Sequence, residues 1–290
     1  MDYEGRICRS PFERGAFMLP IMVGCSHNKC KFCGLFKHLE FRVLPLEQVF
    51  QEISRVASKA GNPNTIFLGD GNAFCLPSEH LLKVCEEIHK QFNQTCKINM
   101  DATVKNILSK SPTELKELAD AGIYNLYIGI ECGLDDVLEF MNKGNNLSEA
   151  KEAISRIKEA GMVYSAHMMS GIAGKGRGEE NAYALAKFFN ETQPLNICNF
   201  DFGLHKSLEL WNDFKCGKYK VSNASERFFE EEILISEIKP NYEMHYDAIF
   251  EAPPLRFRGT LPKDQDKLVA QFKSAKEKYL GQEDLYCIWD

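Results

Sequence analysis

The sequence lacks a long apolar run and a recognisable leader. No apolar stretch in its 290 residues reaches the ~20 residues that a membrane-spanning helix needs. The first residues, MDYEGRICRSPFERG, carry charges throughout. Because no apolar segment follows a basic start there, they do not resemble a signal peptide. We therefore expect a cytoplasmic protein.

The chain also lacks the excess of basic residues that is typical of nucleic-acid-binding proteins. Its formal net charge is −6, and its longest run of charged residues, Glu230–Glu232, is acidic. Nucleic acid is therefore a disfavoured partner. A small molecule is the better-supported hypothesis for the substrate, and tRNA is the weaker one.

Neither an internal repeat nor a low-complexity linker divides the chain. Short apolar runs instead alternate with amphipathic runs of helical spacing as far as residue 205. The expected strands lie at 16–24, 65–68, 97–103, 125–130, 163–169 and 196–204. The expected helices lie at 46–60, 112–121, 135–141, 148–160 and 178–190, with a further one after Pro77, where Ser78 is the expected N-cap.

This alternation predicts an α/β fold. Strands separated by helices imply a parallel sheet with right-handed crossovers, and six such units imply a partial (βα)6 TIM-like barrel rather than a closed one. We expect an N-terminal segment at 1–15, the barrel at 16–205 and a C-terminal α+β extension at 206–290 that covers part of the barrel. Within the extension, helices are expected at 227–238 and 263–279, and a strand at 242–250.

The chain has 11 cysteines, and three of them form a tight cluster. An odd count with irregular spacing does not fit a complete disulfide framework. Cys25, Cys30 and Cys33 are spaced C-x4-C-x2-C. Iron–sulfur cubanes are held by cysteine thiolates, usually four of them. Three local thiolates leave one iron open to a substrate or cofactor.

A structural zinc site is the alternative for this cluster. His27 lies between the cysteines, so Cys25, His27, Cys30 and Cys33 also have the ligand types of a Cys3His site. The position of the cluster favours the first interpretation. It follows the first expected strand of a β/α series, and such folds build their active sites at the carboxyl ends of the strands.

On these features the sequence resembles the radical S-adenosylmethionine (SAM) superfamily, across about residues 16–205. Most members have C-x3-C-x2-C; the longer first gap occurs in subgroups. Phe32 matches the aromatic residue that commonly precedes the third cysteine. Gly69, Asp70, Gly71 and Asn72 follow the second expected strand, where the family has a glycine-rich motif that holds the SAM amino group.

Further stretches that resemble motifs of the family occur later in the chain. Ile128 to Gly133 resembles the I-G-x-E-S-G of enzymes similar to the oxygen-independent coproporphyrinogen oxidases and the tRNA methylthiotransferases, which implies that Glu131 contacts SAM. Met141 to Gly144 resembles the M-x-K-G stretch of the same enzymes. The remaining implied SAM contacts, mostly to adenine, are Ser170, Gly171 and Ile172 after the fifth strand and Phe202, Gly203 and Leu204 after the sixth.

The resemblance implies a radical SAM enzyme with a [4Fe–4S] cluster and SAM as cofactors. Reductive cleavage of SAM would give a 5′-deoxyadenosyl radical that abstracts hydrogen from an unidentified small molecule, with the electron coming from a partner such as flavodoxin or ferredoxin. Cys132, His167 and Lys143 are candidate catalytic residues. A tRNA- or peptide-modifying radical enzyme stays open, as does a zinc or iron–sulfur binding module without catalysis.

Overall fold

The computed structural model describes Glu4 and residues 8–92, 96–282 and 287–289. The chain divides into two compact units, and one of the boundaries between them falls within a long strand, Ile123–Glu131. The first unit comprises residues 1–28, 33–128 and 151–164. The second comprises residues 29–32, 129–150 and 165–290. None of the helices in the described ranges is long and apolar enough to cross a membrane.

The first unit contains a parallel sheet in the order β1-β4-β5-β6. Its strands are β1 (Phe17–Pro20), β4 (Thr65–Gly69), β5 (Lys97–Ala102) and the first part of β6 (Ile123–Glu131). Its helices are α1 (Leu46–Ala57), α2 (Ser78–Gln91), α3 (Val104–Leu108), α4 (Pro112–Asp120) and the end of α6 (Leu147–Glu159). The short elements are η1 (Pro11–Glu13), η2 (Ala73–Cys75), β2 (Met22–Val23) and β3 (Arg42–Val43). The strand β4 is almost wholly apolar, and its last four residues are buried, because both faces of a parallel sheet are covered.

The second unit continues the alternation of parallel strands and helices and ends in an antiparallel strand. Its sheet has the order β7-β8-β10-β11, in which β7 (Val163–Ser170), β8 (Asn196–Asp201) and β10 (Met244–Glu251) are parallel. The edge strand β11 (Pro254–Leu261) is antiparallel to β10. The helices of this unit are α5 (Asp135–Phe140), α7 (Gly178–Thr192), α8 (Leu210–Lys215), α9 (Ala224–Glu237) and α10 (Gln265–Lys278). The short strands β9 (Leu204–His205) and β12 (Ile288–Trp289) pair with each other.

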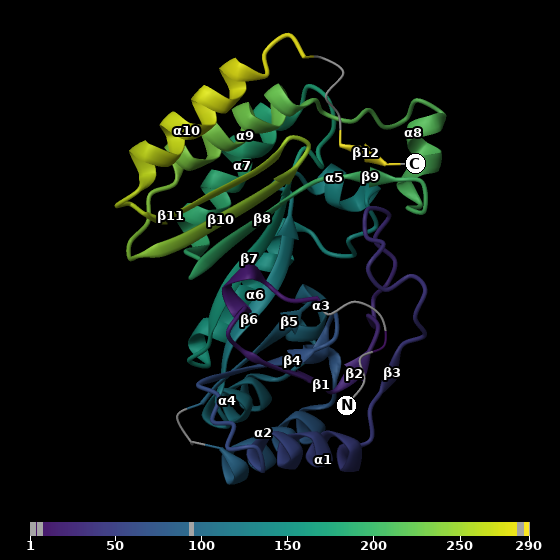
Figure 1. Cartoon of the computed structure of the whole chain (residues 1–290), viewed down its shortest axis with the longest axis vertical. Coiled ribbons are helices and arrows are strands. Elements are labelled where there is room, and N and C mark those ends of the chain that lie inside the picture. The colour runs from purple at the N-terminus through teal and green to yellow at the C-terminus, as the bar shows by residue number, and fades with distance from the viewer. Residues whose placement is uncertain (1–3, 5–7, 93–95, 283–286, 290) are drawn as a thin grey trace. The chain divides into compact units, whose positions relative to one another are not determined.

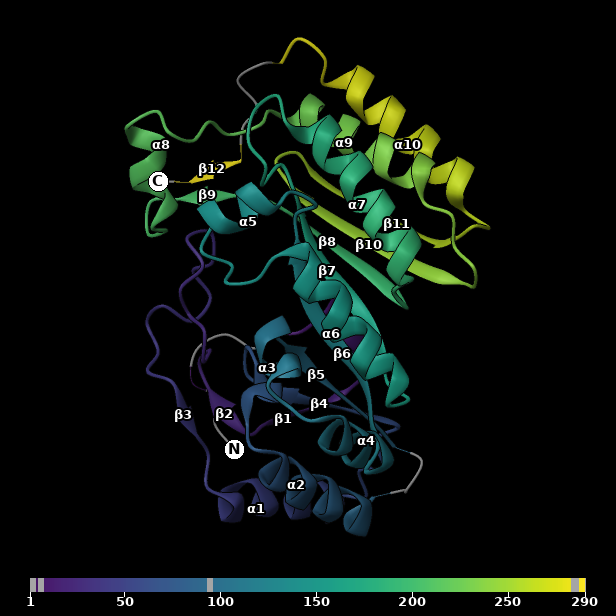
Figure 2. The same cartoon turned by 180° about the vertical axis from the view of Figure 1, so that it is seen from behind.

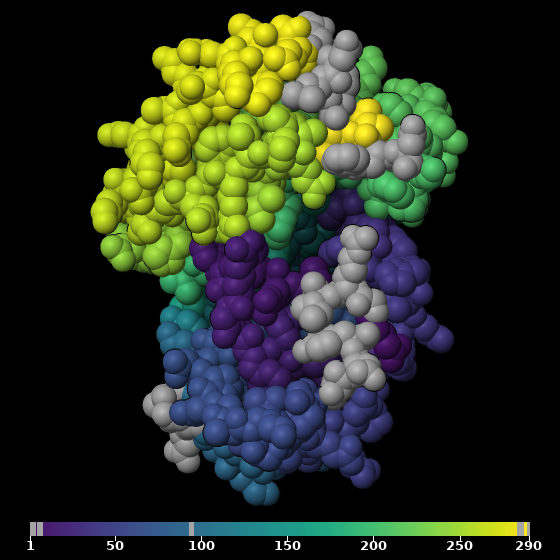
Figure 3. Space-filling model, in the orientation of Figure 1, coloured from purple at the N-terminus to yellow at the C-terminus, as the bar shows by residue number. Residues whose placement is uncertain are grey.

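Three helices cover one face of the second unit's sheet. Figures 1 and 2 show α7, α9 and α10 side by side along β8, β10 and β11. An aromatic cluster fills the space between them, with the rings of Phe257 and Phe272 4.3 Å apart and those of Phe228 and Phe250 4.8 Å apart. The outer side of α10 and the β10–β11 hairpin form one exposed region in Figure 3.

The predicted α/β alternation is confirmed, and three local expectations need correction. The first expected strand breaks at Ile21 into β1, which pairs with β4, and β2, which pairs with β3. Ser78 does not cap its helix: Pro77 holds the N-cap position, and the Ser78 hydroxyl donates to Glu114 at 2.8 Å. The strand β11 was not expected, because Arg256 and Arg258 interrupt its apolar pattern.

Candidate active site

The three clustered cysteines lie in an irregular loop between β2 and β3. Cys25, Cys30 and Cys33 are each half-buried. Asn28 takes a left-handed conformation, with φ of 40°, and its side-chain amide donates to the carbonyl of Phe36 at 2.9 Å. These contacts fold the loop back on itself, so the cysteines are presented from a shaped loop and not from a helix.

The segment that carries Cys30 belongs to the second unit and is fixed there at Lys31. The Lys31 amide donates to the carbonyl of Met141 at 3.0 Å, and its carbonyl accepts from Leu210 at 3.2 Å. Its ammonium group pairs with Asp213 at 3.0 Å and lies 4.5 Å from the centre of the Phe140 ring. Backbone and side chain thus both hold the residue next to Cys30.

The donor set suits a soft metal centre. Thiolates are the ligands that iron–sulfur clusters use, and three of them are supplied within nine residues of sequence. Across the ranges that the structure describes, no three or more His, Cys, Asp or Glu side chains gather as ligands of a single metal ion.

The Gly69-Asp70-Gly71 turn lies at the end of β4, and its two glycines differ in the space around them. A Cβ on Gly69 would meet no atom within 4 Å, whereas a Cβ on Gly71 would come within 2.2 Å of the Phe36 ring. Gly71 is therefore required by the close approach of Phe36, and Gly69 faces open space that a ligand can fill. Burial raises the pKa of Asp70 to about 6, although the Gly24 amide donates to its carboxylate.

Asn72 is buried, and all of its side-chain contacts are internal. Its amide nitrogen donates to the hydroxyl of Ser26 at 2.6 Å and to Asn106 at 2.8 Å. Its amide oxygen accepts from the backbone of Thr103 at 3.0 Å. Asn72 therefore joins the residue next to Cys25 to the turn after β5, which suits a positioning residue better than a direct SAM contact.

Glu131 and Lys143 form a partly buried ion pair at the end of β6. The Lys143 ammonium lies 2.8 Å from a carboxylate oxygen of Glu131, and Glu131 adopts a φ of 62°. A Cβ on Gly129 would stand 2.2 Å from that oxygen and 2.4 Å from the ammonium nitrogen. The glycine of the I-G-x-E motif is thus explained by the space that this ion pair occupies.

His167 lies close enough to this ion pair for both charges to affect it. Burial lowers the pKa of His167 to about 4, against the opposing effect of Glu131 and with a smaller contribution from Lys143. Its ring packs against Phe200 with centroids 5.6 Å apart. The Lys143 ammonium also lies 6.0 Å from the centre of the Phe32 ring. The neutral imidazole, the ion pair and Phe32 are therefore connected within one unit.

The loop after β7 is held by residues from the C-terminal part of the chain. The Gly171 amide donates to Glu230 at 2.9 Å, and the Tyr219 hydroxyl contacts the carbonyls of Gly171 and Ile172, each at 3.1 Å. The Ser170 carbonyl accepts from the Phe202 amide at 3.0 Å. These hydrogen bonds occupy most of the backbone polar atoms of the loop. The loop is therefore held rigidly, and the surface that it leaves for a ligand is largely apolar.

The residues that follow β8 are mainly core residues. Phe202 and Leu204 are buried, and Phe202 meets the Tyr219 ring edge-on at 6.0 Å. Leu204 donates its amide to the carbonyl of Cys287 at 2.8 Å. Gly203 between them is half-buried.

Cys132 is completely buried and contacts α7. Its thiol lies 3.1 Å from the side-chain oxygen of Asn181, which also accepts from the Gly133 amide at 2.7 Å. Burial raises the pKa of this thiol far above its usual range. The thiol is therefore protonated at neutral pH, so the role that this geometry leaves for Cys132 is that of a hydrogen-atom donor and not that of a thiolate ligand or nucleophile.

Four residues that hold the loop after β7 were missed from the sequence: Asn181, Tyr219, Arg227 and Glu230. Arg227 and Glu230 are fully buried on α9. One signal could have located Arg227. Arg227, Phe228, Glu231, Leu234 and Ile235 recur at the spacing of one helix face, so charged and apolar residues alternate on the same buried stripe.

Comparison with protein families places most of these features in one known domain. A model described as "Radical SAM superfamily" matches residues 19–186, which is more than half of the chain. The heme chaperone HemW of Bacillus subtilis is 27% identical over 158 residues, covering 52% of this chain and 41% of that protein. The tRNA-2-methylthio-N(6)-dimethylallyladenosine synthase of Chlorobium luteolum is 24% identical over 192 residues, covering 62% of this chain and 39% of that protein. The chain therefore spans less than half the length of these relatives.

Solved structures with a similar fold include coproporphyrinogen III oxidase (HemN) of Escherichia coli. It has a TM-score of 0.58 at 17% identity, over 77% of this chain and 50% of that one. Methylornithine synthase (PylB) has a TM-score of 0.56 at 12% identity, over 77% and 63% of the two chains. At these identities the likeness shows the fold, which supports the predicted partial barrel.

Proposed function

Because the chain belongs to the radical SAM superfamily, we propose that Cys25, Cys30 and Cys33 hold its cluster and that it acts on a small molecule. Enzymes of this superfamily use a [4Fe–4S] cluster and SAM. The observation that carries the proposal is the loop after β2, which supplies three half-buried thiols and is followed in the sequence by an ordered series of strand-end motifs.

A reduced [4Fe–4S] cluster held by these cysteines would supply the electron for reductive cleavage of SAM, the radical chemistry that we propose for hydrogen abstraction from the substrate. The chain's own residues bind and orient. In the first unit, Gly69 leaves open space for a bound ligand. In the second unit, Glu131 would accept hydrogen bonds from SAM, and Lys143 balances the carboxylate charge. The neutral imidazole of His167 is available to hold or move one proton beside this pair.

The proposed electron donor is a small redox protein of the flavodoxin or ferredoxin type. For the substrate we propose only its chemical class, a small molecule. The named heme chaperones among the relatives, and the fold shared with a coproporphyrinogen oxidase, make tetrapyrroles the first small molecules to test.

The direct test is anaerobic formation of 5′-deoxyadenosine. Protein reconstituted with iron and sulfide is incubated with SAM and dithionite, and the product is measured by mass spectrometry. We expect product only when the cluster, SAM and reductant are all present, and faster formation with the true substrate. A protein that takes up zinc and assembles no cubane would contradict the proposal.

The role of Glu131 is tested by crowding its carboxylate. Gly129→Ala places a methyl group where the Glu131–Lys143 pair now lies, so the pair must move. We expect the Kd for SAM, measured by equilibrium dialysis without reductant, to rise about tenfold, as for the loss of one charge-assisted contact. Gly15→Ala is the matched control, since no atom lies within 4 Å of its added Cβ. Unchanged SAM affinity in the Gly129 variant would remove Glu131 from the proposed SAM contacts.

A further inference from the structure

The second unit contains a pocket of about 480 Å³ that the proposed chemistry does not use. Its walls come from α5, from the loop 172–177 before α7 and from the segment 217–220. Glu131, Lys143 and His167 do not line it, and Ile172 is its one residue among those proposed to contact SAM. The volume lies within the range of small-molecule sites.

The lining of this pocket is strongly cationic. Its charged side chains are Lys175, Arg177, Lys218 and Lys220 against Asp136. Arg177 is already paired, with Asp136 at 2.6 Å and with Glu180 at 2.9 Å. The three lysines are exposed, and none of them makes an ion pair to any residue that the structure describes. Among the described residues, three positive charges therefore have no ion-pair partner, in a chain whose net charge is −6.

The backbone brings two of these lysines together. The Lys175 amide donates to the Lys220 carbonyl at 2.8 Å. Gly174, with φ of 86°, lies so close that a Cβ there would stand 3.0 Å from the same carbonyl oxygen. Because this hydrogen bond joins their backbones, both lysine side chains start from the same part of the pocket wall, and an anion bound there would be attracted by both positive charges.

The other wall of the pocket is apolar and aromatic. The rings of Phe140 and Tyr219 are stacked, with centroids 6.3 Å apart and an angle of 17° between their planes. Val137, Met141 and Ala173 extend this wall. A ligand with a flat apolar body would bury surface here while its charged group met the lysines.

We propose that this pocket binds a small organic anion in which a phosphate or carboxylate group is attached to a flat apolar body. Lys175, Lys218 and Lys220 bind the anionic group, and the Phe140–Tyr219 pair contacts the body. The proposal goes beyond the function proposed above and does not rest on it, because binding here requires neither cluster reduction nor SAM cleavage.

The test compares two dianions of similar charge, inorganic phosphate and 1-naphthyl phosphate. Their binding to the reconstituted protein is measured by isothermal titration calorimetry at low salt, with SAM present to occupy its own site. We expect 1-naphthyl phosphate to bind about tenfold more tightly than phosphate, because only its ring buries apolar area. In the variant Lys175→Glu/Lys220→Glu, binding should weaken by about tenfold or more, since attraction becomes repulsion.

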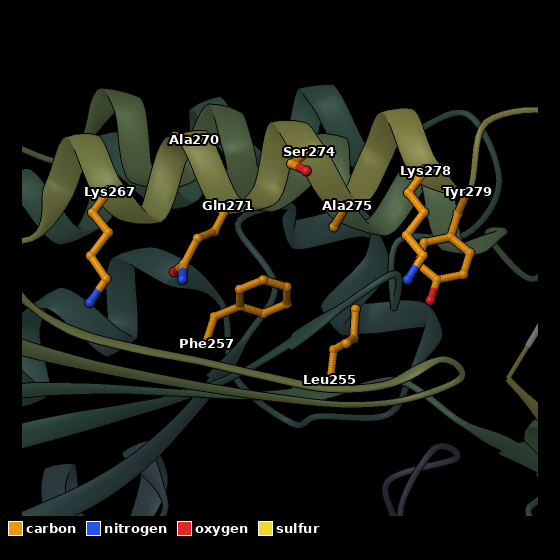
Figure 4. Close-up of a pocket in the computed structure, with 9 residues that line it drawn as sticks. All are labelled: Leu255, Phe257, Lys267, Ala270, Gln271, Ser274, Ala275, Lys278 and Tyr279. Atoms are coloured by element: carbon orange, nitrogen blue, oxygen red, sulfur yellow. The ribbon is translucent and has the colours of Figure 1, made fainter.

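A second groove in the same unit supplies the matched control. This groove lies between α10 and β11 and has a volume of about 460 Å³. Figure 4 shows Lys267 and Lys278 among its lining residues, together with Phe257 and Tyr279. The variant Lys267→Glu/Lys278→Glu changes the net charge by the same amount and removes the same number of exposed lysines.

The control variant should bind 1-naphthyl phosphate as the unchanged protein does. An equal loss in both variants would overturn the proposal, because general charge and not this pocket would then govern binding. Full affinity in the Lys175→Glu/Lys220→Glu variant, or no binding of 1-naphthyl phosphate to the unchanged protein, would overturn it as well.

Discussion

Replacing Cys30 by alanine should abolish 5′-deoxyadenosine formation and leave the protein without an intact cubane. Two thiolates cannot replace the usual set of cysteine ligands of a cluster. The loss should exceed about 100-fold, which is already the upper end of what removing a mere supporting partner of a metal ligand costs. Iron and sulfide content, the electron paramagnetic resonance spectrum of the reduced protein and the product assay measure this together.

Cys216→Ala is the matched control for this experiment. Cys216 is an exposed thiol in the same unit as Cys30, and it lies outside the cysteine cluster. Its variant should keep full iron content and full product formation. A Cys30 variant that retained a complete, active cluster would contradict the proposed ligand set and direct the search to the thiol of Cys75, which interacts with Cys25 and Ser26.

Replacing Arg227 by methionine should destabilise the protein by about 3–5 kcal/mol, the usual cost of breaking a buried ion pair on one side. The Arg227 guanidinium lies 2.6 Å from the carboxylate of Asp201, and both side chains are fully buried. It also donates to the carbonyls of Ser222 and Ala252. Without it, the buried carboxyl of Asp201, whose pKa burial already raises to about 6, loses the positive charge that lowers this pKa.

Denaturant unfolding followed by circular dichroism measures this loss. Lys116→Met is the control, because its partner Asp120 and Lys116 itself are both more than half exposed, and the unfolding midpoint should hardly change. The double variant Arg227→Met/Asp201→Asn should be more stable than Arg227→Met alone, since no unpaired charge is then buried. Equal stability of Arg227→Met and the unchanged protein would show that the buried pair contributes no net stability.

Arg227 also matters for the candidate site. It packs against Gly171, where a Cβ would stand 2.7 Å from its side chain, and its neighbour Glu230 accepts the Gly171 amide. Burial raises the pKa of Glu230 to about 7. The helix α9, which follows the expected barrel segment in the sequence, is therefore what holds the loop after β7 in place.

Much of the fold was predictable because it depends on local pattern. The strands β4 to β8 follow from short apolar runs, and Gly122 and Gly161 follow helix ends with positive φ. The cysteine spacing and the order of the strand-end motifs likewise lie in the linear sequence. These features are properties of short segments, so no long-range contact is needed to recognise them.

Other features were not predictable, because they depend on residues distant in sequence. Ser78 has the residue type of an N-cap, yet its hydroxyl bonds to Glu114 on another helix. Glu230 belongs to an acidic run, yet it is buried against Asn181 and Gly171. Gly129 is one of 20 glycines, and only the position of Lys143 shows why a side chain cannot stand there.

The sequence by itself determined the β/α order, the family resemblance and the three thiols, since periodicity, motif order and ligand spacing are all local. Only the tertiary structure decided which polar side chains are buried and which charges lie together. It paired Glu131 with Lys143, placed Arg227 and Glu230 behind the loop after β7, and brought Lys175 beside Lys220. Such contacts join segments that lie far apart in the chain, so no single segment encodes them.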